Sequence, residues 1–285
     1  MLTRSIHPAG RKVNGQTLPH IKLRPASGWQ ALNLAQVWQF RDLALAFAGR
    51  DIKLRYRQTF LGIAWVIFQP LMAAGIFSFV FGRIAKLDTN FIFSYVGMLG
   101  WNVFSTTLTK SSGCLVQNAG LISKVFFPRL ILPVSVVFST LVDFVIAFMM
   151  LFVMAFFYRI HPATELLLMP VWIVLLLALA TGFGLFTSAL MVSYRDVQYI
   201  LPVLTQFLLF ASPIGYSVAE VPLRYRNLYD LNPLVGLLEG FRWSLLGGSM
   251  PDWTSVGYSA GVTVFVLVGG AFAFKKMERQ FADVI

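Results

Sequence analysis

Charged residues are scarce in this chain of 285 residues: only 12% are Asp, Glu, Lys or Arg, whereas 57% are hydrophobic. A soluble domain has about 25% charged residues. A globular core cannot enclose so much apolar surface, so the composition excludes an ordinary soluble protein and indicates a chain that crosses a membrane several times. Acids are the scarcer charge, 12 against 23 Lys and Arg. Because the basic residues adjoin apolar runs, we expect this excess to meet anionic lipid head groups rather than nucleic acid.

Residues that build disulfides, metal sites and hydrolytic centres are also few. The single cysteine, Cys114, excludes an internal disulfide, and the three histidines lie too far apart to suggest a metal site. The sequence has no Gly-x-x-x-x-Gly-Lys-Ser/Thr phosphate loop, no Gly-x-Ser-x-Gly elbow and no Cys-x-x-Cys pair. We therefore expect no metal and no cofactor on this chain. It is not expected to be an enzyme, and the energy for any transport would come from a partner.

Long apolar runs, in contrast, are abundant. A spanning helix needs about 20 mostly apolar residues, and six stretches meet or approach this length: Phe60–Phe81, Phe91–Leu108, Pro133–Phe157, Leu166–Val192, Tyr199–Tyr216 and Val256–Phe274. The sequence therefore predicts an all-α, polytopic membrane protein with six transmembrane helices. A seventh apolar stretch, Leu231–Gly248, is interrupted by Pro233, Glu239 and Arg242. It is expected to form an outer re-entrant or interfacial helical hairpin.

The distribution of lysine and arginine predicts the orientation. With six spans both termini lie on one side of the membrane, and the ends and connections on that side hold 17 of the 23 basic residues. The positive-inside rule therefore places both termini, and the loop 109–132, in the cytoplasm.

The segment before the first span has two parts. Residues 1–32 mix Pro, Gly, Ser and basic residues, as expected for a flexible cytoplasmic arm. Residues 33–58 are expected to form an amphipathic helix in the membrane surface, with Phe40 and Phe47 on its apolar side. Its basic end leads into the six-span domain, residues 59–285. The basic residues there either only fix the topology or also bind a phosphate-bearing substrate, and both alternatives stay open for Arg50, Lys53, Arg55 and Arg57.

The cytoplasmic loop 109–132 is too long for a simple turn. Ser111 or Ser112 can cap a short helix that Gly120 ends. Such a helix, projecting into the cytoplasm, would offer a handle to another protein. The second cytoplasmic connection is brief and carries a charged pair, Arg195 and Asp196.

Asp143 is the one acid near the middle of a predicted span. An ionisable group at that depth is costly and usually faces protein or a water-filled cavity, which makes Asp143 a functional candidate. A hydrogen bond to Ser139 or Thr140 would instead satisfy it without any function.

Aromatic residues make up 15% of the chain. Ring faces bind the C–H surfaces of sugars without holding them tightly, which suits a sliding substrate. Five rings are candidates for lining such a path: Tyr95, Trp101, Phe104, Phe210 and Tyr216.

Four stretches together resemble the permeases of ATP-binding-cassette exporters for lipid-linked polysaccharides, of the O-antigen and capsule export type. "RDIKLRYRQTFLGIAWVIFQPL" followed by "FSFVFGRI" is similar to their basic segment and first span. "NAGLISKVFFPRLILP" resembles the first cytoplasmic coupling segment, "SYRDVQYILP" the connection before the fifth span, and "LNPLVGLLEGFRWSLLG" the outer re-entrant helices. The resemblance covers about residues 34–275, in order and at compatible spacing.

The resemblance implies a homodimer of permeases in the bacterial inner membrane, with two separate ATPase subunits that carry ATP and Mg. A polyprenyl-diphosphate-linked glycan would pass between the protomers. The implied head-group residues are the four basic residues already named. The implied ATPase-coupling residues are Gln117, Asn118, Leu121, Ile122 and Lys124, with a second contact at Arg195 and Asp196. The implied outer gate contains Gly236, Glu239, Gly240 and Arg242.

Two other classes stay open. One is an exporter of another lipid or of a drug with the same architecture. The other is a membrane glycosyltransferase or phosphotransferase that acts on polyprenyl phosphates. An enzyme of that kind would need acids in the cytoplasmic loops to hold a divalent metal, and the acids available there are scattered along the sequence.

Overall fold

The computed structural model describes residues 12–13, 16–17, 34–57, 59, 62–159, 164–248 and 250–278. The chain divides into two units, residues 1–32 and 33–285, and each is described by itself. In the first unit, β1 (Lys12–Val13) pairs antiparallel with β2 (Gln16–Thr17). The rest of the predicted arm lies outside the described residues.

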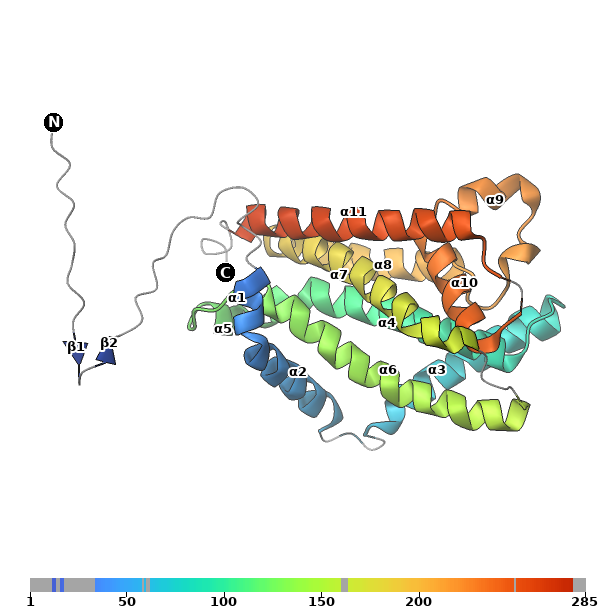
Figure 1. Ribbon diagram of the computed structural model, residues 1–285, viewed down its shortest axis with the longest axis horizontal. Helices are drawn as coiled ribbons and strands as arrows, with labels where there is room; N and C mark the ends of the chain where they lie inside the picture. The colour runs from blue at the N-terminus through green and yellow to red at the C-terminus, as the bar shows by residue number, and fades with distance from the viewer. Residues whose placement is uncertain are drawn as a thin grey trace. The chain divides into compact units, whose positions relative to one another are not determined.

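The described part of the second unit is built from helices (Figure 1). In chain order they are α1 (Leu34–Gln39), α2 (Arg41–Tyr56), α3 (Ala64–Phe77), the π-helix η2 (Ser78–Ile84), α4 (Phe91–Gln117), α5 (Ala119–Ile122), α6 (Ile131–Tyr158), the 3₁₀ turn η3 (Thr164–Leu168), α7 (Met169–Ser193), α8 (Val197–Phe210), the 3₁₀ turn η4 (Val218–Glu220), α9 (Leu223–Tyr229), α10 (Pro233–Leu246) and α11 (Trp253–Met277).

The long helices run side by side between two ends of this bundle (Figure 1). One end, here called the α5 end, holds α5, the last turns of α4, α7 and α11, and the first turns of α6 and α8. The opposite end, here called the α9 end, holds α9, α10 and the connections that precede α4 and α7. The segments predicted to be cytoplasmic, 109–132 and the connection that begins at Ser193 and carries Arg195 and Asp196, therefore share one end of the bundle.

Helix α4 forms the centre of the bundle. It packs against α3, α6, α7, α8 and α10. Tyr95 and Phe104 of α4 belong to one core cluster with Leu176 and Leu179 of α7 and Phe241 of α10. Because α4 is surrounded by protein along most of its length, it can carry polar residues that a lipid-facing helix could not.

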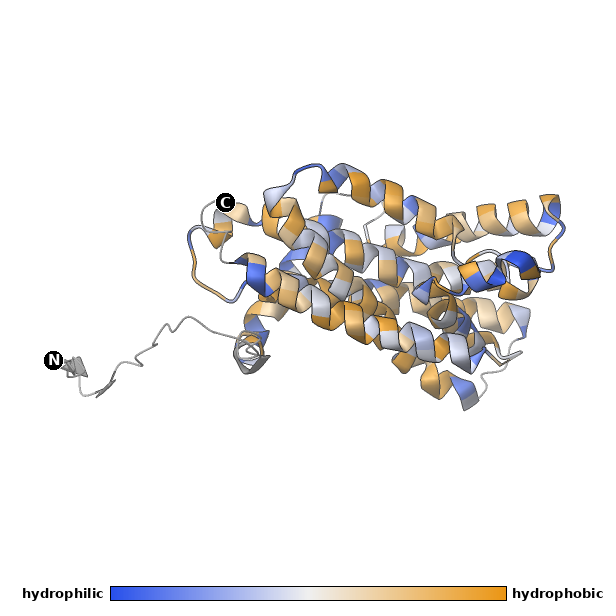
Figure 2. Cartoon of the chain, turned by 90° about the horizontal axis from the view of Figure 1, so that it is seen from above, coloured by the Kyte–Doolittle hydropathy of each residue, from blue (hydrophilic) through white to orange (hydrophobic). Residues whose placement is uncertain are grey.

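The outward faces of the long helices are apolar. Phe156 of α6, Phe207 of α8 and Phe265 of α11 are all largely exposed. Figure 2 shows mostly hydrophobic colour along the long helices, with the strongest hydrophilic colour mainly toward the two ends of the bundle. Apolar side chains on the outside of a bundle are stable in hydrocarbon and unfavourable in water. By length and composition, four helical segments of the described chain can cross a membrane: Ala64–Ile84, Ile131–Tyr158, Thr164–Ser193 and Trp253–Met277.

These four segments correspond to the first, third, fourth and sixth predicted spans. The second, α4, is 27 residues long, but its polar residues keep it below the hydropathy of a lipid-exposed span. The fifth, α8, ends at Phe210 rather than at the predicted Tyr216. Pro213 offers no backbone N–H to continue a helix. The carbonyls of Pro213 and Ile214 instead accept hydrogen bonds from the side chain of Arg242.

The predicted short helix beginning at Ser111 or Ser112 is wrong. Helix α4 continues through both serines, which are buried. The Ser112 hydroxyl donates to the Leu108 carbonyl at 2.7 Å, so it bonds within the helix instead of capping a new one. Gly120 ends no helix either, because it lies inside α5.

The predicted break inside Leu231–Gly248 is also wrong, because α10 is continuous from Pro233 to Leu246. Glu239 and Arg242 lie one turn apart on this helix and neutralise each other at 2.9 Å. Where one helix was predicted over residues 33–58, the structure has two, α1 and α2, which are separated by a turn at Phe40.

The buried side of α2 carries Ala44 and Ala48, and the helix packs along α6. Its Phe47 ring lies 5.6 Å from the ring of Phe127. The side predicted to face lipid therefore partly contacts protein.

Candidate functional site

Asp143 of α6 joins three helices through one carboxylate. Its Oδ2 accepts a hydrogen bond from Arg55 of α2 and lies 3.1 Å from Nζ of Lys110 on α4. Its Oδ1 accepts from the Tyr56 hydroxyl at 2.7 Å. The Asp143 side chain is only 14% exposed. These four residues are called here the Asp143 cluster.

The Asp143 cluster holds two cations for one carboxylate, so it carries one uncompensated positive charge. Burial, and next the nearby Asp143 carboxylate, raise the pKa of Tyr56 to about 12, so the phenol stays protonated and donates. The proposed satisfaction of Asp143 by serine or threonine is wrong. Ser139 donates to the Val136 carbonyl, and the Thr140 hydroxyl has no hydrogen-bond partner among the described residues.

A cavity of about 380 Å³ opens beside the Asp143 cluster. Its other walls include an indole, two carboxamides and two hydroxyls, from Trp65, Gln69, Asn102, Thr106 and Thr140. A second cavity, of about 370 Å³, lies between α4 and α8, and a third, of about 230 Å³, lies among α2, α4 and α6. Lys110 lines each of these three cavities.

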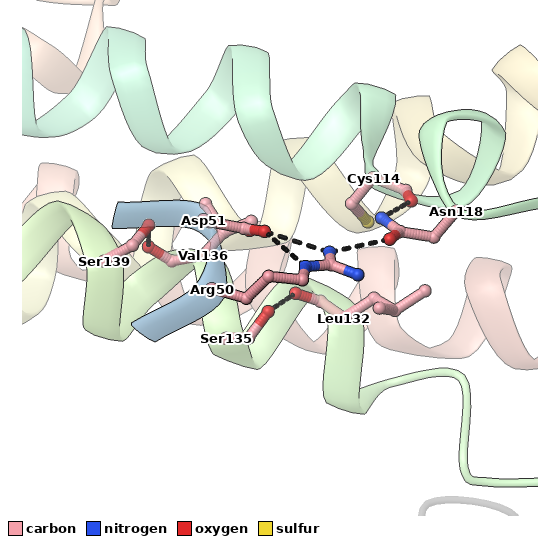
Figure 3. Close-up of polar contacts among 8 residues, drawn as sticks. All are labelled: Arg50, Asp51, Cys114, Asn118, Leu132, Ser135, Val136 and Ser139. Atoms are coloured by element: carbon pink, nitrogen blue, oxygen red, sulfur yellow. Dashed lines mark hydrogen bonds and ion pairs between the residues drawn. The ribbon is translucent and has the colours of Figure 1, made fainter. Parts of the chain in front are cut away.

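The four predicted head-group residues do not form one patch. Arg55 belongs to the Asp143 cluster, while Lys53 on α2 and Arg57, just after α2, are exposed. Arg50 points toward the bundle, as Figure 3 shows, where its Nη2 lies 2.9 Å from Asp51 Oδ1 and donates to Asn118 Oδ1 at 2.8 Å. One predicted head-group residue is therefore bonded to a predicted coupling residue.

Asn118 is held from a second direction. Its amide nitrogen donates to the Cys114 carbonyl at 2.8 Å, across the junction of α4 and α5 (Figure 3). Arg50 thus contacts the point at which the long central helix gives way to the short projecting one.

The predicted coupling residues all lie at the α5 end. Gln117 and Lys124 are exposed, as are Arg195 and Asp196 just before α8, whereas Asn118, Leu121 and Ile122 are partly buried. Sequence reasoning missed two strongly exposed rings at the same end, Phe126 and Tyr194. Exposed aromatic rings are typical anchors of protein interfaces.

The five aromatic candidates for a sugar path do not share one surface within this chain. Tyr95 is buried in the core, where its hydroxyl donates to the Ala147 carbonyl at 2.8 Å. Trp101 and Phe104 lie with ring centroids 5.7 Å apart. The other two are bonded to each other, because the Tyr216 hydroxyl donates to the Phe210 carbonyl at 2.8 Å. The aromatic path stays a prediction.

The predicted outer-gate residues are tightly packed in α10. Arg242 is 5% exposed and donates to Glu239 and to the carbonyls that follow α8. Its guanidinium lies 3.8 Å from the ring centroid of Phe93 on α4, which adds a cation–π interaction. A Cβ at Gly240 would lie 2.6 Å from the Trp172 ring, and one at Gly236 would lie 2.7 Å from the Ser255 carbonyl oxygen.

Sequence reasoning missed Lys110 and Tyr56, and the polar wall of the first cavity. A signal for it exists, because Asn102, Thr106 and Lys110 recur every four residues and so share one face of a helix. The predicted end of the second span, at Leu108, separated the lysine from the other two.

Comparisons with known proteins find similar sequences among transport proteins. A family model described as ABC-2 type transporter matches residues 43–246. The O-antigen export system permease protein RfbA of Myxococcus xanthus is 28% identical over 254 residues, covering 88% of this chain and 98% of that protein. An RfbA of the same description from Klebsiella pneumoniae is 26% identical over 252 residues, covering 86% and 95%. The polysialic acid transport protein KpsM of Escherichia coli is 26% identical over 240 residues, covering 81% and 91%. The chain belongs to the ABC-2 type transporter family.

Proposed function

We propose that this chain is the membrane-spanning subunit of an ATP-driven exporter. It moves a polyprenyl-diphosphate-linked polysaccharide, of the O-antigen or capsule type, from the cytoplasmic side across the bacterial inner membrane. The names of the similar permeases support this substrate class. The observation that carries the proposal is the hydrogen bond between Arg50 and Asn118. It joins α2, which holds the proposed head-group residues, to the segment at the α5 end that we propose contacts the ATPase.

The proposed topology has six passes, with both termini and the α5 end in the cytoplasm. Helix α4 makes the second pass surrounded by other helices, so its polar residues contact protein instead of lipid. Helix α8 is too short to cross alone, and the chain completes the fifth pass through residues 211–216. Residues 212–215 are buried, and Arg242 supplies backbone partners at Pro213 and Ile214. Helices α1 and α2 lie at the cytoplasmic interface.

The proposed partners are two copies of an ATPase subunit and a second copy of this chain. ATP and Mg bind the ATPase, which performs the hydrolysis, and this chain provides the docking segment. Gln117, Lys124, Phe126, Arg195 and Asp196 are exposed together at the α5 end and form a suitable surface. The glycan passes between the two copies of this chain.

In the proposed mechanism, closure of the ATPases on ATP displaces the segment around Asn118. Arg50 carries that displacement to α2, and Arg55 and Tyr56 carry it to Asp143 on α6. The helices then shift as rigid bodies, the usual response of packed elements to a local push.

The function is tested by deleting the gene for this chain in its source bacterium. We expect surface polysaccharide to disappear and the lipid-linked form to accumulate inside the cell, with both restored by the intact gene. The tagged chain should co-isolate with an ATPase. Unchanged surface polysaccharide would contradict the proposal, and so would sugar transfer to polyprenyl phosphate by the purified chain.

The coupling surface is tested separately with Lys124→Glu. Reversing this exposed charge should lower transport-linked ATP hydrolysis by the assembled complex several-fold, because it places repulsion inside a charged interface. Arg224→Glu, an exposed reversal on α9, is the matched control and should leave hydrolysis unchanged. Equal hydrolysis by both variants would remove Lys124 from the contact.

A further inference from the structure

We propose that the cavity beside the Asp143 cluster binds a phosphate ester, and that Lys110 and Arg55 take up the phosphate by exchanging it for Asp143. The inference rests on the proposed function, because the ester is then the diphosphate head group of the exported lipid. Lys110 has no role in the sequence-based assignment, and Asp143 becomes a resident counter-ion rather than a group that contacts substrate.

The charges of the cluster support an exchange. A lysine and an arginine that lie partly out of water are costly without a partner, so an empty site needs a built-in anion. Asp143 supplies it, with Oδ2 shared between Arg55 and Lys110. A diphosphate offers more charge and more acceptor oxygens than one carboxylate. Guanidinium and ammonium groups bind such oxygens through charge-assisted hydrogen bonds.

An unused donor on the cavity wall also points to a ligand. Thr140 lies one helical turn before Asp143, is 2% exposed, and its hydroxyl has no hydrogen-bond partner among the described residues. Buried polar groups without a partner are uncommon. Rotation of this hydroxyl into the cavity would give it a phosphate oxygen as acceptor once Asp143 is displaced.

The other walls suit the first sugar of a glycan. Trp65 contributes an indole to the cavity wall, and Gln69, Asn102 and Thr106 contribute amide and hydroxyl groups. Apolar ring faces with a few placed polar groups are the usual composition of a small-molecule site, and about 380 Å³ lies in the usual range of about 300–1,000 Å³.

Lys110 also connects the first cavity to the other two, because it lines all three. It lines the second cavity, where Trp101 and Gln206 form part of the wall, and the third, which reaches Gln117 and Asn118. A phosphate held by Lys110 can therefore move from the first cavity to the second without losing its cation.

The test uses the complete transporter in lipid nanodiscs, freed of native substrate. The probe is a fluorescent, short-chain polyprenyl diphosphate disaccharide, and the same polyprenyl chain ending in an alcohol is the phosphate-free control. Lys110→Gln should weaken binding of the diphosphate probe by about tenfold or more, the size of one charge-assisted hydrogen bond. It should leave binding of the alcohol unchanged.

Two further variants separate exchange from general electrostatics. Asp143→Asn should tighten diphosphate binding, because it removes the competing anion. The double variant Lys110→Gln, Asp143→Asn has the formal charge of the native cluster, yet without Lys110 it should bind more weakly than the native protein, although more tightly than Lys110→Gln, in which Asp143 still competes for Arg55. Native-like binding by the double variant would mean that only net charge matters and would overturn the proposal. Lys110→Arg, which keeps the cation, should retain most of the binding and shows that the site folds.

Other outcomes also decide the question. If folded Asp143→Asn binds the probe more weakly than the native protein, Asp143 only holds the cations in place and the exchange is refuted. Equally tight binding of pyrophosphate or phosphatidylglycerol would identify a free phosphate or bulk lipid as ligand and refute the head-group assignment. If Lys110→Gln binds normally while deletion of the gene still abolishes export, only this inference fails. If deletion leaves export intact, the proposed function fails.

Discussion

Two arginine–carboxylate pairs lie in opposite halves of this bundle, and they differ in their partners, their surroundings and the space beside them. Arg55 and Asp143 come from different helices, share the site with a second cation and border a cavity of about 380 Å³. Arg242 and Glu239 lie one turn apart on α10, and the arginine is covered by two backbone carbonyls and the Phe93 ring.

The difference separates a site that can exchange its partner from one that cannot. The Arg242 guanidinium is held by groups of the protein itself, so another anion could enter only by breaking the packing. Arg55 and Lys110 depend on one carboxylate, and space for a larger anion lies beside it. The Arg242–Glu239 pair is therefore a fixed structural contact, here called the pin, and the Arg55–Asp143 pair is suited to a ligand.

The largest expected effect on stability comes from removing the buried guanidinium of Arg242. Arg242→Gln should destabilise the folded protein by about 3–5 kcal/mol, because it leaves buried carbonyls and Glu239 without their partner. The melting temperature of the purified transporter measures the loss. Glu239 is partly exposed and can be hydrated, so Glu239→Gln should cost about 1 kcal/mol or less. Equal losses in the two variants would contradict a pin that acts through the carbonyls.

A smaller effect is expected from overfilling the same half. Gly240→Ala would bring a methyl group against the Trp172 ring, and overpacking of this kind costs about 1–3 kcal/mol. Gly261→Ala in α11, where a Cβ would meet nothing within 4 Å, is the matched control. The control should match or slightly raise the native melting temperature, because alanine favours helix more than glycine does. A Gly240→Ala protein as stable as the control would show that α10 can move away from α7.

The smallest effect on stability, with a clear effect on coupling, is expected at Arg50. Arg50→Gln should cost less than about 1 kcal/mol, because the arginine is partly exposed. Substrate-stimulated ATP hydrolysis should nevertheless fall, because α2 loses its bond to Asn118. Arg41→Gln, an exposed substitution on the same helix, is the control.

A double-mutant cycle then tests whether Arg50 and Asn118 act together. Asn118→Ala should add nothing to the loss of stimulation already caused by Arg50→Gln. Fully additive losses would show that the two residues act independently.

The sequence predicted the apolar helices well because a lipid-facing helix must be hydrophobic at nearly every exposed position. The spans at Pro133–Phe157 and Val256–Phe274 lie within α6 and α11. The same reasoning ended the second span at Leu108, since Thr109, Lys110 and the serines beyond look like loop. In the folded chain α7 and α6 cover that region, so helix propensity and protein packing decide there instead of lipid.

The site was predicted in part for a related reason. Asp143 and Arg55 each stood out alone, one as a charge inside a span and the other within a basic segment. Their contact depends on how α2 packs along α6, and on the true length of α4, which brings Lys110 to the same carboxylate. A single sequence shows neither this packing nor the point at which α4 ends. The cluster could be suspected residue by residue but not assembled.

Helix α4 is uninterrupted over 27 residues, or about 40 Å at 1.5 Å per residue. Phe93, in its first turn, touches Arg242, and Gln117, at its other end, adjoins Asn118. Because the helix has no break between these two contacts, it has no hinge that could absorb a rotation or a shift along its axis. We therefore expect a movement imposed on the end of α4 next to Asn118 to reach Arg242 at the opposite end directly through the helix.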